Sequence, residues 1–102
     1  MTKFKTRISQ SSTDSRIILA NDYDTTNKKI VSQTIQNIKS LHKFLCGIKL
    51  NFHVLLPLGK KEIIRINKAA HKYGLQTIAD IKLNDIGNTN QITSKTLWDF
   101  GF

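Results

Sequence analysis

The sequence predicts an α/β protein with a parallel sheet, in the order strand, helix, strand, helix, strand, helix. Three short apolar runs lack the alternation of half-exposed strands, which is typical of parallel strands covered on both faces. Helix-length stretches with apolar residues three or four positions apart lie between these runs, as the crossovers of a parallel sheet require. A chain of 102 residues with 39% hydrophobic residues is sufficient for one such domain and its core.

The chain opens with a polar segment, and the first strand follows it. Residues 1–15 contain few large apolar side chains, so we expect a flexible lead-in before an ordered domain in residues 16–102. The first strand is expected at residues 17–20 (Ile-Ile-Leu-Ala), buried on both faces. An amphipathic helix follows, with its apolar positions in residues 30–41 and candidate N-cap side chains at residues 25–27.

A second strand and a second helix repeat this pattern. The strand is expected at residues 44–48 (Phe-Leu-Cys-Gly-Ile), followed directly by Lys49. After an irregular stretch through Pro57, a helix is expected to begin at Gly59 and to end at Gly74. Four apolar residues share one face of this helix: Ile63, Ile66, Ala70 and Tyr73.

The third strand is expected at residues 75–82, and the third helix is expected to begin within residues 88–90 and to turn Ile92, Thr96 and Leu97 inward.

A parallel sheet must be covered on its faces, and two architectures achieve this: an open doubly wound sheet and a closed (β/α)8 barrel. The order of the elements leaves both open. In either architecture, functional sites form at the C-terminal edge of the strands.

Charged residues follow all three predicted strands at that edge. Asp22 follows the first strand, Lys49 the second, and Asp80 and Lys82 close the third. Side chains two positions apart on a strand share a face, so we expect Asp80 and Lys82 to form an ion pair. Asp85 lies just beyond the strand. Carboxylates around a lysine favour its charged form, which can donate a proton or stabilise a developing carbanion.

The net charge, the single cysteine and the lengths of the apolar runs indicate which kinds of partner and location to expect. A net charge of +9 favours polyanions, but the 13 lysines are scattered without an arginine cluster, which favours a solvated lysine-rich surface over a nucleic-acid partner. Cys46 has no second cysteine and is expected in the core. No apolar run approaches the roughly 20 residues of a membrane helix, so we expect a cytoplasmic protein without a membrane partner.

One segment resembles the signature of a known family. Residues 80–89 (DIKLNDIGNT) resemble the D-x-K-x-x-D-I-x-x-T motif of the orotidine 5'-phosphate decarboxylase family, whose members are (β/α)8 barrels. Residues 19–22 (LAND) resemble the family's first-strand L-A-x-D, and residues 47–49 (GIK) its second-strand lysine segment. Gly87 departs from the proline usual in the family. The resemblance implies a βαβαβα unit, about three-eighths of a TIM barrel.

The resemblance also implies a role for each matching residue. Asp22 and Lys49 would hold the ribose hydroxyls, with Lys49 also bonding Asp80, and Asp80 would face the orotate carboxylate. Lys82 would stabilise the carbanion at pyrimidine C6 and then protonate it. The implied catalytic residues are Lys49, Asp80, Lys82 and Asp85, and the implied substrate-binding residues are Asp22, Lys49, Ile86 and Thr89.

The implied partners are orotidine 5'-phosphate and its product UMP. Asp85, Ile86 and Thr89 would reach into the site of a second subunit, so a homodimer or a complementing polypeptide is expected. No metal and no organic cofactor is implied. Because only part of a barrel is present, we expect the isolated chain to be inactive or very weak.

Two other functions remain open at this point. The first is a related barrel decarboxylase or synthase that acts on a sugar phosphate with a metal and shares the D-x-K-x-x-D pattern. Ile86 and Thr89 favour the orotidine branch over this one. The second is a basic, non-catalytic fragment that binds nucleic acid, which would not depend on Asp80 or Lys82.

Overall fold

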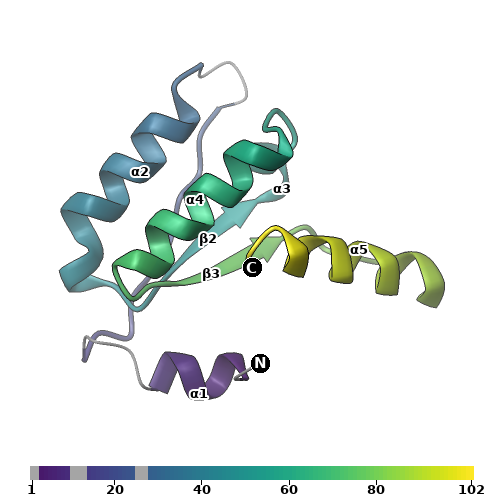
Figure 1. The fold of residues 1–102 in the computed structure, drawn as a ribbon, viewed down its shortest axis with the longest axis horizontal. Coiled ribbons are helices and arrows are strands. Elements are labelled where there is room, and N and C mark those ends of the chain that lie inside the picture. Colours follow the sequence, from purple (N-terminus) through teal and green to yellow (C-terminus); the bar gives the residue numbers. More distant parts are fainter. Residues whose placement is uncertain (1–2, 10–13, 25–27) are drawn as a thin grey trace.

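A parallel sheet of three strands forms the centre of the fold (Figure 1). The structure, a computed structural model, describes residues 3–9, 14–24 and 28–102. The strands are β1 (Ile18–Ala20), β2 (Gly47–Asn51) and β3 (Gln76–Asp80), and they lie in sequence order. Both neighbouring pairs are parallel, which confirms the predicted α/β class and agrees with part of a barrel of βα units.

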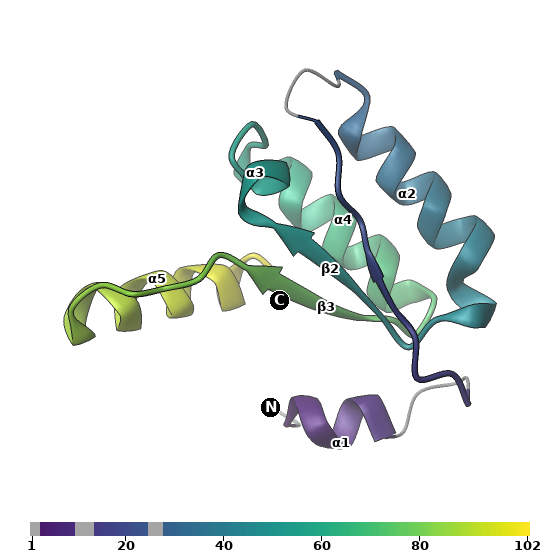
Figure 2. The same ribbon diagram turned by 180° about the vertical axis from the view of Figure 1, so that it is seen from behind.

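Two long helices connect these strands and cover the same face of the sheet. α2 and α4 lie side by side in front of the strands in Figure 1 and behind them in Figure 2. The helices are α1 (Phe4–Ser9), α2 (Ile30–Leu41), the 3-10 helix η1 (His42–Phe44), α3 (Phe52–Leu55), α4 (Lys60–Lys72) and α5 (Gly87–Asp99). None of the described helices has the length and apolar character needed to span a membrane.

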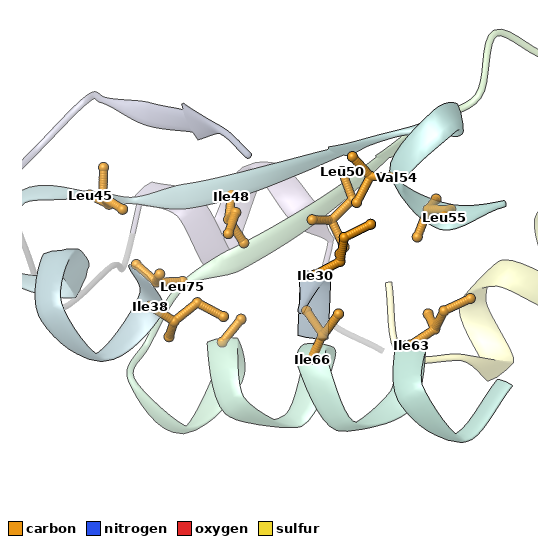
Figure 3. Close-up of a cluster of buried hydrophobic side chains, with 11 residues drawn as sticks. Ile30, Ile38, Leu45, Ile48, Leu50, Val54, Leu55, Ile63, Ile66 and Leu75 are labelled. Carbon is orange, nitrogen blue, oxygen red and sulfur yellow. The ribbon is translucent and has the colours of Figure 1, made fainter. Parts of the chain in front are cut away.

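The hydrophobic core lies between the sheet and these two helices (Figure 3). Ile48 and Leu50 alternate along β2 on the helix-facing side, where they meet Ile38 of α2 and Ile66 of α4. All four side chains are fully buried. Lys49 lies between Ile48 and Leu50 and therefore projects to the opposite face, away from the core.

The boundaries of α4 follow the sequence prediction. The N–H of Gly59, the N-cap residue, donates to the Glu62 carboxylate over 2.9 Å, which satisfies a donor that the helix leaves unpaired. Gly74 has a φ of 79°, a left-handed conformation that glycine adopts without a steric penalty. Its N–H donates to the His71 carbonyl and terminates the helix.

The first two strands differ from their predicted form. β2 begins at Gly47 rather than at residue 44, because Phe44 belongs to η1 and is 65% exposed. Leu45 and Cys46 are buried just before this strand. The N–H of Cys46 donates to the Ile17 carbonyl over 2.9 Å, and its carbonyl accepts from the Gln76 N–H over 3.1 Å, so its backbone already bonds to the neighbouring strand segments. The predicted burial of the first strand on both faces is wrong: Ile18 is 41% exposed, since helices cover only one face of the sheet.

The third helix is much more exposed than predicted. No residue of α5 is buried, Ile92 is 59% exposed and Thr96 is exposed, so the prediction that these two turn inward is wrong. Leu97 is half-buried. The axis of α5 runs outward from the end of β3 (Figure 2), and no strand lies beneath the helix. The residue that follows the helix is tied to α4 by a 2.8 Å hydrogen bond from Asn67 Nδ2 to the Phe100 carbonyl.

Two short helices lie where the sequence predicted none. α1 falls within the polar lead-in, and its Arg7 Nε donates to Gln76 Oε1 on β3 over 2.7 Å. α3 forms a single turn within the stretch predicted as irregular. The candidate N-cap residues 25–27 lie outside the described residues, as do residues 1–2 and 10–13 of the lead-in.

Candidate active site

The register of the sheet brings the charged residues of two strands together. Lys49 pairs with Ile78, and Asn51 pairs with Asp80, so Lys49 and Asp80 lie on the same face and one pleat apart. This is the face opposite to α2 and α4, and both residues lie toward the C-terminal ends of their strands. The position is the edge at which parallel α/β folds build their sites.

Asp80 is held between two lysines. Its Oδ2 lies 3.2 Å from Lys49 Nζ, and its Oδ1 lies 2.8 Å from Lys82 Nζ, so each oxygen accepts from a different ammonium. The side chains of Lys49 and Asp80 are 33% and 24% exposed, whereas that of Lys82 is 80% exposed. The hydrogen bonds from Lys82 first, and from Lys49 second, lower the pKa of Asp80, so the cluster carries one negative and two positive charges at neutral pH.

The backbone that brings Lys82 to Asp80 is not that of a strand. β3 ends at Asp80, and Lys82 has a φ of 48°, the one positive φ among the described residues other than glycine. A left-handed conformation costs a residue with a side chain about 1–2 kcal/mol. The predicted ion pair is therefore present, but a left-handed turn makes it rather than the pleat of a strand.

Asp22 lies at the same edge of the sheet but outside this cluster. It follows two residues after Ala20, which pairs with Lys49, and the N–H of Asn21 donates to the Lys49 carbonyl over 3.0 Å. The side chain of Asp22 is exposed, and within the described ranges no ion pair joins it to Lys49 or Lys82. Its position is thus set by backbone pairing between the first two strands.

A buried polar network, which the sequence analysis did not identify, fixes the end of β1. Asn21 is 2% exposed, and its Nδ2 donates to Thr34 Oγ1 of α2 over 2.8 Å. Its Oδ1 accepts from Asn37 Nδ2 over 3.0 Å, and the same nitrogen of Asn37 lies 2.7 Å from the Tyr23 hydroxyl. A sequence signal was available, because Thr34 and Asn21 are polar residues at positions where the pattern requires burial.

The loop that carries Asp85 is organised by its own hydrogen bonds. Asn90 accepts from the Asp85 N–H over 3.2 Å and donates to the Asp85 carbonyl over 2.8 Å. Asp85 Oδ1 accepts from the N–H of Ile86 over 2.7 Å. Ile86 is 71% exposed and Thr89 is exposed, and within residues 28–102 no hydrogen bond or ion pair joins Asp85, Ile86 or Thr89 to Asp80.

Asn51 is a further polar residue of this face that the sequence analysis missed. It is the cross-strand partner of Asp80, and its Oδ1 is buried without a hydrogen-bond partner among the described residues. A buried unpaired acceptor is costly and is therefore uncommon in folded proteins. Asn51 adds an unused acceptor to the cluster of Lys49, Asp80 and Lys82.

Two cavities of the described chain, of about 430 and 600 Å³, lie away from this cluster, along β3 and against residues of α1 and α5. Their lining residues include Arg7 and Trp98, but neither cavity is lined by Lys49, Asp80 or Lys82. The cluster of Lys49, Asp80 and Lys82 lies instead on the face of the sheet that α2 and α4 leave uncovered. Within the described ranges, His, Cys, Asp and Glu form no group of three or more that could hold a metal ion.

Comparisons with known proteins agree with this arrangement. The chain is 32% identical to an orotidine 5'-phosphate decarboxylase of Thermococcus kodakarensis over 89 residues, which cover 86% of this chain and 38% of that protein. It is 38% identical to an orotidine 5'-phosphate decarboxylase of Pyrococcus furiosus over 58 residues, which cover 57% of this chain and 26% of that protein. No solved structure matches the chain. The sequence model of one family matches residues 15–98, and the chain therefore belongs to the Orotidine 5'-phosphate decarboxylase / HUMPS family.

Proposed function

We propose that this chain supplies the reacting groups of an orotidine 5'-phosphate decarboxylase, which converts orotidine 5'-phosphate to UMP and carbon dioxide. The observation that carries the proposal is Asp80 held between Lys49 and Lys82 at the C-terminal edge of the sheet. The family match and the names of both relatives support the same reaction.

In the proposed mechanism, the bond between pyrimidine C6 and the substrate carboxylate breaks. Carbon dioxide leaves, and the electron pair of that bond remains on C6. The Lys82 ammonium stabilises this carbanion and then donates its proton to C6, which completes UMP. The Asp80 carboxylate faces the substrate carboxylate, so it repels the ground state more than a transition state that is losing that charge.

The remaining residues bind substrate in this proposal. Lys49 and Asp22 hold the ribose hydroxyls, and the strand register supports this because both residues lie at the C-terminal edge of neighbouring strands. Asp85, Ile86 and Thr89 reach toward a second subunit, and their exposure is compatible with that role. The whole site then forms in a homodimer or with a complementing polypeptide.

The chain matches only part of each relative, and this bears on whether the chain is active by itself. The chain spans 38% of one relative and 26% of the other, so groups elsewhere in those proteins have no counterpart in the matched segment. We therefore expect turnover by the isolated chain to be absent or very slow, because the sheet has an open edge and an uncovered face.

A chimera tests the proposal directly. Residues 16–98 would replace the matching segment of the Thermococcus kodakarensis enzyme, and UMP formation would be measured for the chimera and for its Lys82→Ala variant. We expect the chimera to release UMP, and the variant to lose at least a thousandfold in kcat while still binding UMP, because the amine acts mainly on the transition state. An active Lys82→Ala chimera would contradict the role assigned to Lys82.

The same chimera discriminates the alternative within the family. The name of the family joins orotidine 5'-phosphate decarboxylase to a second group of members, called HUMPS. The alternative to be tested is the metal-dependent reaction on a sugar phosphate that the sequence left open. Magnesium-dependent turnover of a sugar phosphate, without UMP formation, would assign the chain to that alternative. The names of the two relatives favour the orotidine reaction.

A further inference from the structure

The positive charge of the chain is concentrated on one layer of the fold. Residues 28–43 and 60–72, which contain α2, η1 and α4, carry nine lysines and arginines against the single acid Glu62. The remainder of the chain carries seven basic and six acidic residues, so it is almost neutral. The lysines are scattered along the sequence, which predicted an ordinary solvated surface, but the fold gathers more than half of the basic residues on the layer of α2, η1 and α4.

Four basic residues form a row along the outer side of α4. Lys61, Arg65, Lys68 and Lys72 are spaced by four, three and four positions, which places them on one face of the helix. All four are exposed, and the opposite face, with Ile66 and Ala70, is buried against the sheet. At a rise of about 1.5 Å per residue, the row extends over about 16 Å.

The end of α2 extends this row sideways. His42 of η1 stacks on Tyr73 with the ring centroids 4.6 Å apart, which joins the C-terminal end of α2 to that of α4. Lys39 and Lys43 are exposed at this end, close in sequence to His42, as Lys72 is to Tyr73. Figure 1 shows the two helix ends side by side. We call Lys39, Lys43, Lys61, Arg65, Lys68 and Lys72 the outer basic face.

Among the described residues, no ion pair involves any of these six cations. The ion pairs at Asp80 lie on the opposite side of the sheet. Glu62 is occupied at the N-terminus of α4, where it accepts from the Gly59 N–H. Six uncompensated cations on a fixed scaffold repel one another, so binding of a polyanion would relieve a cost already present in the folded chain.

The chemistry of the face indicates which polyanion fits. None of the large hydrophobic side chains exposed on the described residues belongs to α2 or α4, although Phe44 of η1, next to Lys43 in the sequence, is 65% exposed. The face therefore lacks the cluster of apolar anchors that protein partners or inserted membrane helices use. A nucleic-acid duplex carries one phosphate per about 3.4 Å along each strand, and a row of about 16 Å therefore faces four or five phosphates. The helix fixes the spacing of these cations, and among the described residues there is no group beside them that would select particular bases. Such a row suits a regular phosphate backbone.

We propose that the outer basic face binds the phosphate backbone of double-stranded nucleic acid without sequence preference. This function is separate from decarboxylation and does not rest on the proposed reaction, because the face lies on the helices and the cluster at Asp80 lies on the far side of the sheet. With four phosphates neutralised, the logarithm of the binding constant should fall with the logarithm of salt with a slope of about −3.6.

The test compares two variants with the same net charge in a titration of a short labelled DNA duplex. The first is Lys61→Glu/Arg65→Glu/Lys68→Glu on the outer basic face. The second is Lys3→Glu/Lys5→Glu/Lys95→Glu, whose three positions are also exposed but lie outside α2, η1 and α4. We expect the unchanged chain to lose about 150-fold in affinity between about 50 and 200 mM salt.

We expect the first variant to bind at least tenfold more weakly than the second, with a slope reduced by about 3. Equal losses in both variants, or binding of the unchanged chain that does not respond to salt, would overturn the proposal. The variant Lys61→Gln/Arg65→Gln/Lys68→Gln removes charge without adding repulsion, and its thermal unfolding checks that the fold persists. The same titration with phosphatidylserine vesicles tests a lipid surface as the partner. If the unchanged chain binds vesicles as tightly as the DNA duplex, and the first variant loses that binding while the second keeps it, the outer basic face binds lipid headgroups and the proposal is overturned.

Discussion

The buried network at the end of β1 yields a quantitative prediction. Asn21 is 2% exposed and Thr34 is fully buried, and the two are joined by a 2.8 Å hydrogen bond. Thr34→Val keeps the shape of the side chain but leaves Asn21 Nδ2 buried without its acceptor, which should cost about 1–3 kcal/mol. Asn21→Ala removes this hydrogen bond and the one from Asn37, and should cost about 2–4 kcal/mol in total.

The double variant carries the decisive information. Once Asn21 is alanine, Thr34→Val leaves no unsatisfied amide behind, so its own cost should fall close to zero. The free energies of unfolding of the four chains, from urea titrations followed by circular dichroism, then give a coupling of about 1–3 kcal/mol. The slope of each titration must stay constant for this comparison to hold. Costs that add to within about 0.5 kcal/mol would refute the network, because additivity is the behaviour of independent sites.

Three further predictions follow from single contacts. The pKa of Asp80, lowered chiefly by its hydrogen bond from Lys82, should rise toward the ordinary value of about 3.9 in Lys82→Ala, which a carboxyl NMR titration measures. The stabilisation that this pair gives is present above the ordinary value and is lost as pH falls through the lower folded pKa, and urea unfolding at a series of pH values measures that loss. Burial, and then the charge of Arg7, lowers the pKa of His71, so stability should fall as pH drops through about 6.5, and Arg7→Gln should raise that pKa in an imidazole NMR titration; an unchanged value would show that α1 does not dock on β3. Ile66→Ala should cost about 2–5 kcal/mol in urea unfolding, because the side chain is fully buried between α4 and the sheet, and a loss below 1 kcal/mol would contradict that packing.

The departures from the predicted elements have a common physical origin. Hydrophobic periodicity reports that a side chain is buried, but it does not report what buries it. The pattern therefore predicts a strand that begins at Phe44, which lies in η1, and it predicts that Ile92 is buried although no strand lies under α5. α1 was missed because a six-residue helix leaves little periodic signal and because its position depends on tertiary contacts, such as the hydrogen bond from Arg7 to Gln76.

The candidate site was accessible to sequence reasoning only in part. The residue types at the strand ends named Asp22, Lys49, Asp80 and Lys82, because functional groups gather at the C-terminal edge of parallel strands. The unpaired oxygen of Asn51 and the hydrogen bonds of Asn90 to the Asp85 backbone could not be anticipated, since both depend on how a side chain meets groups elsewhere in the fold.

The sequence by itself determined the α/β class, the order of the strands and long helices, and the charged residues at the edge of the sheet. These features are encoded locally, in the spacing of apolar residues and in side-chain chemistry. The tertiary structure alone decided that Lys82 reaches Asp80 through a left-handed turn, that Asn21 bonds Thr34, and that scattered lysines become one charged face. Each of these depends on contacts between residues distant in the chain or on a single backbone angle, neither of which the local pattern specifies.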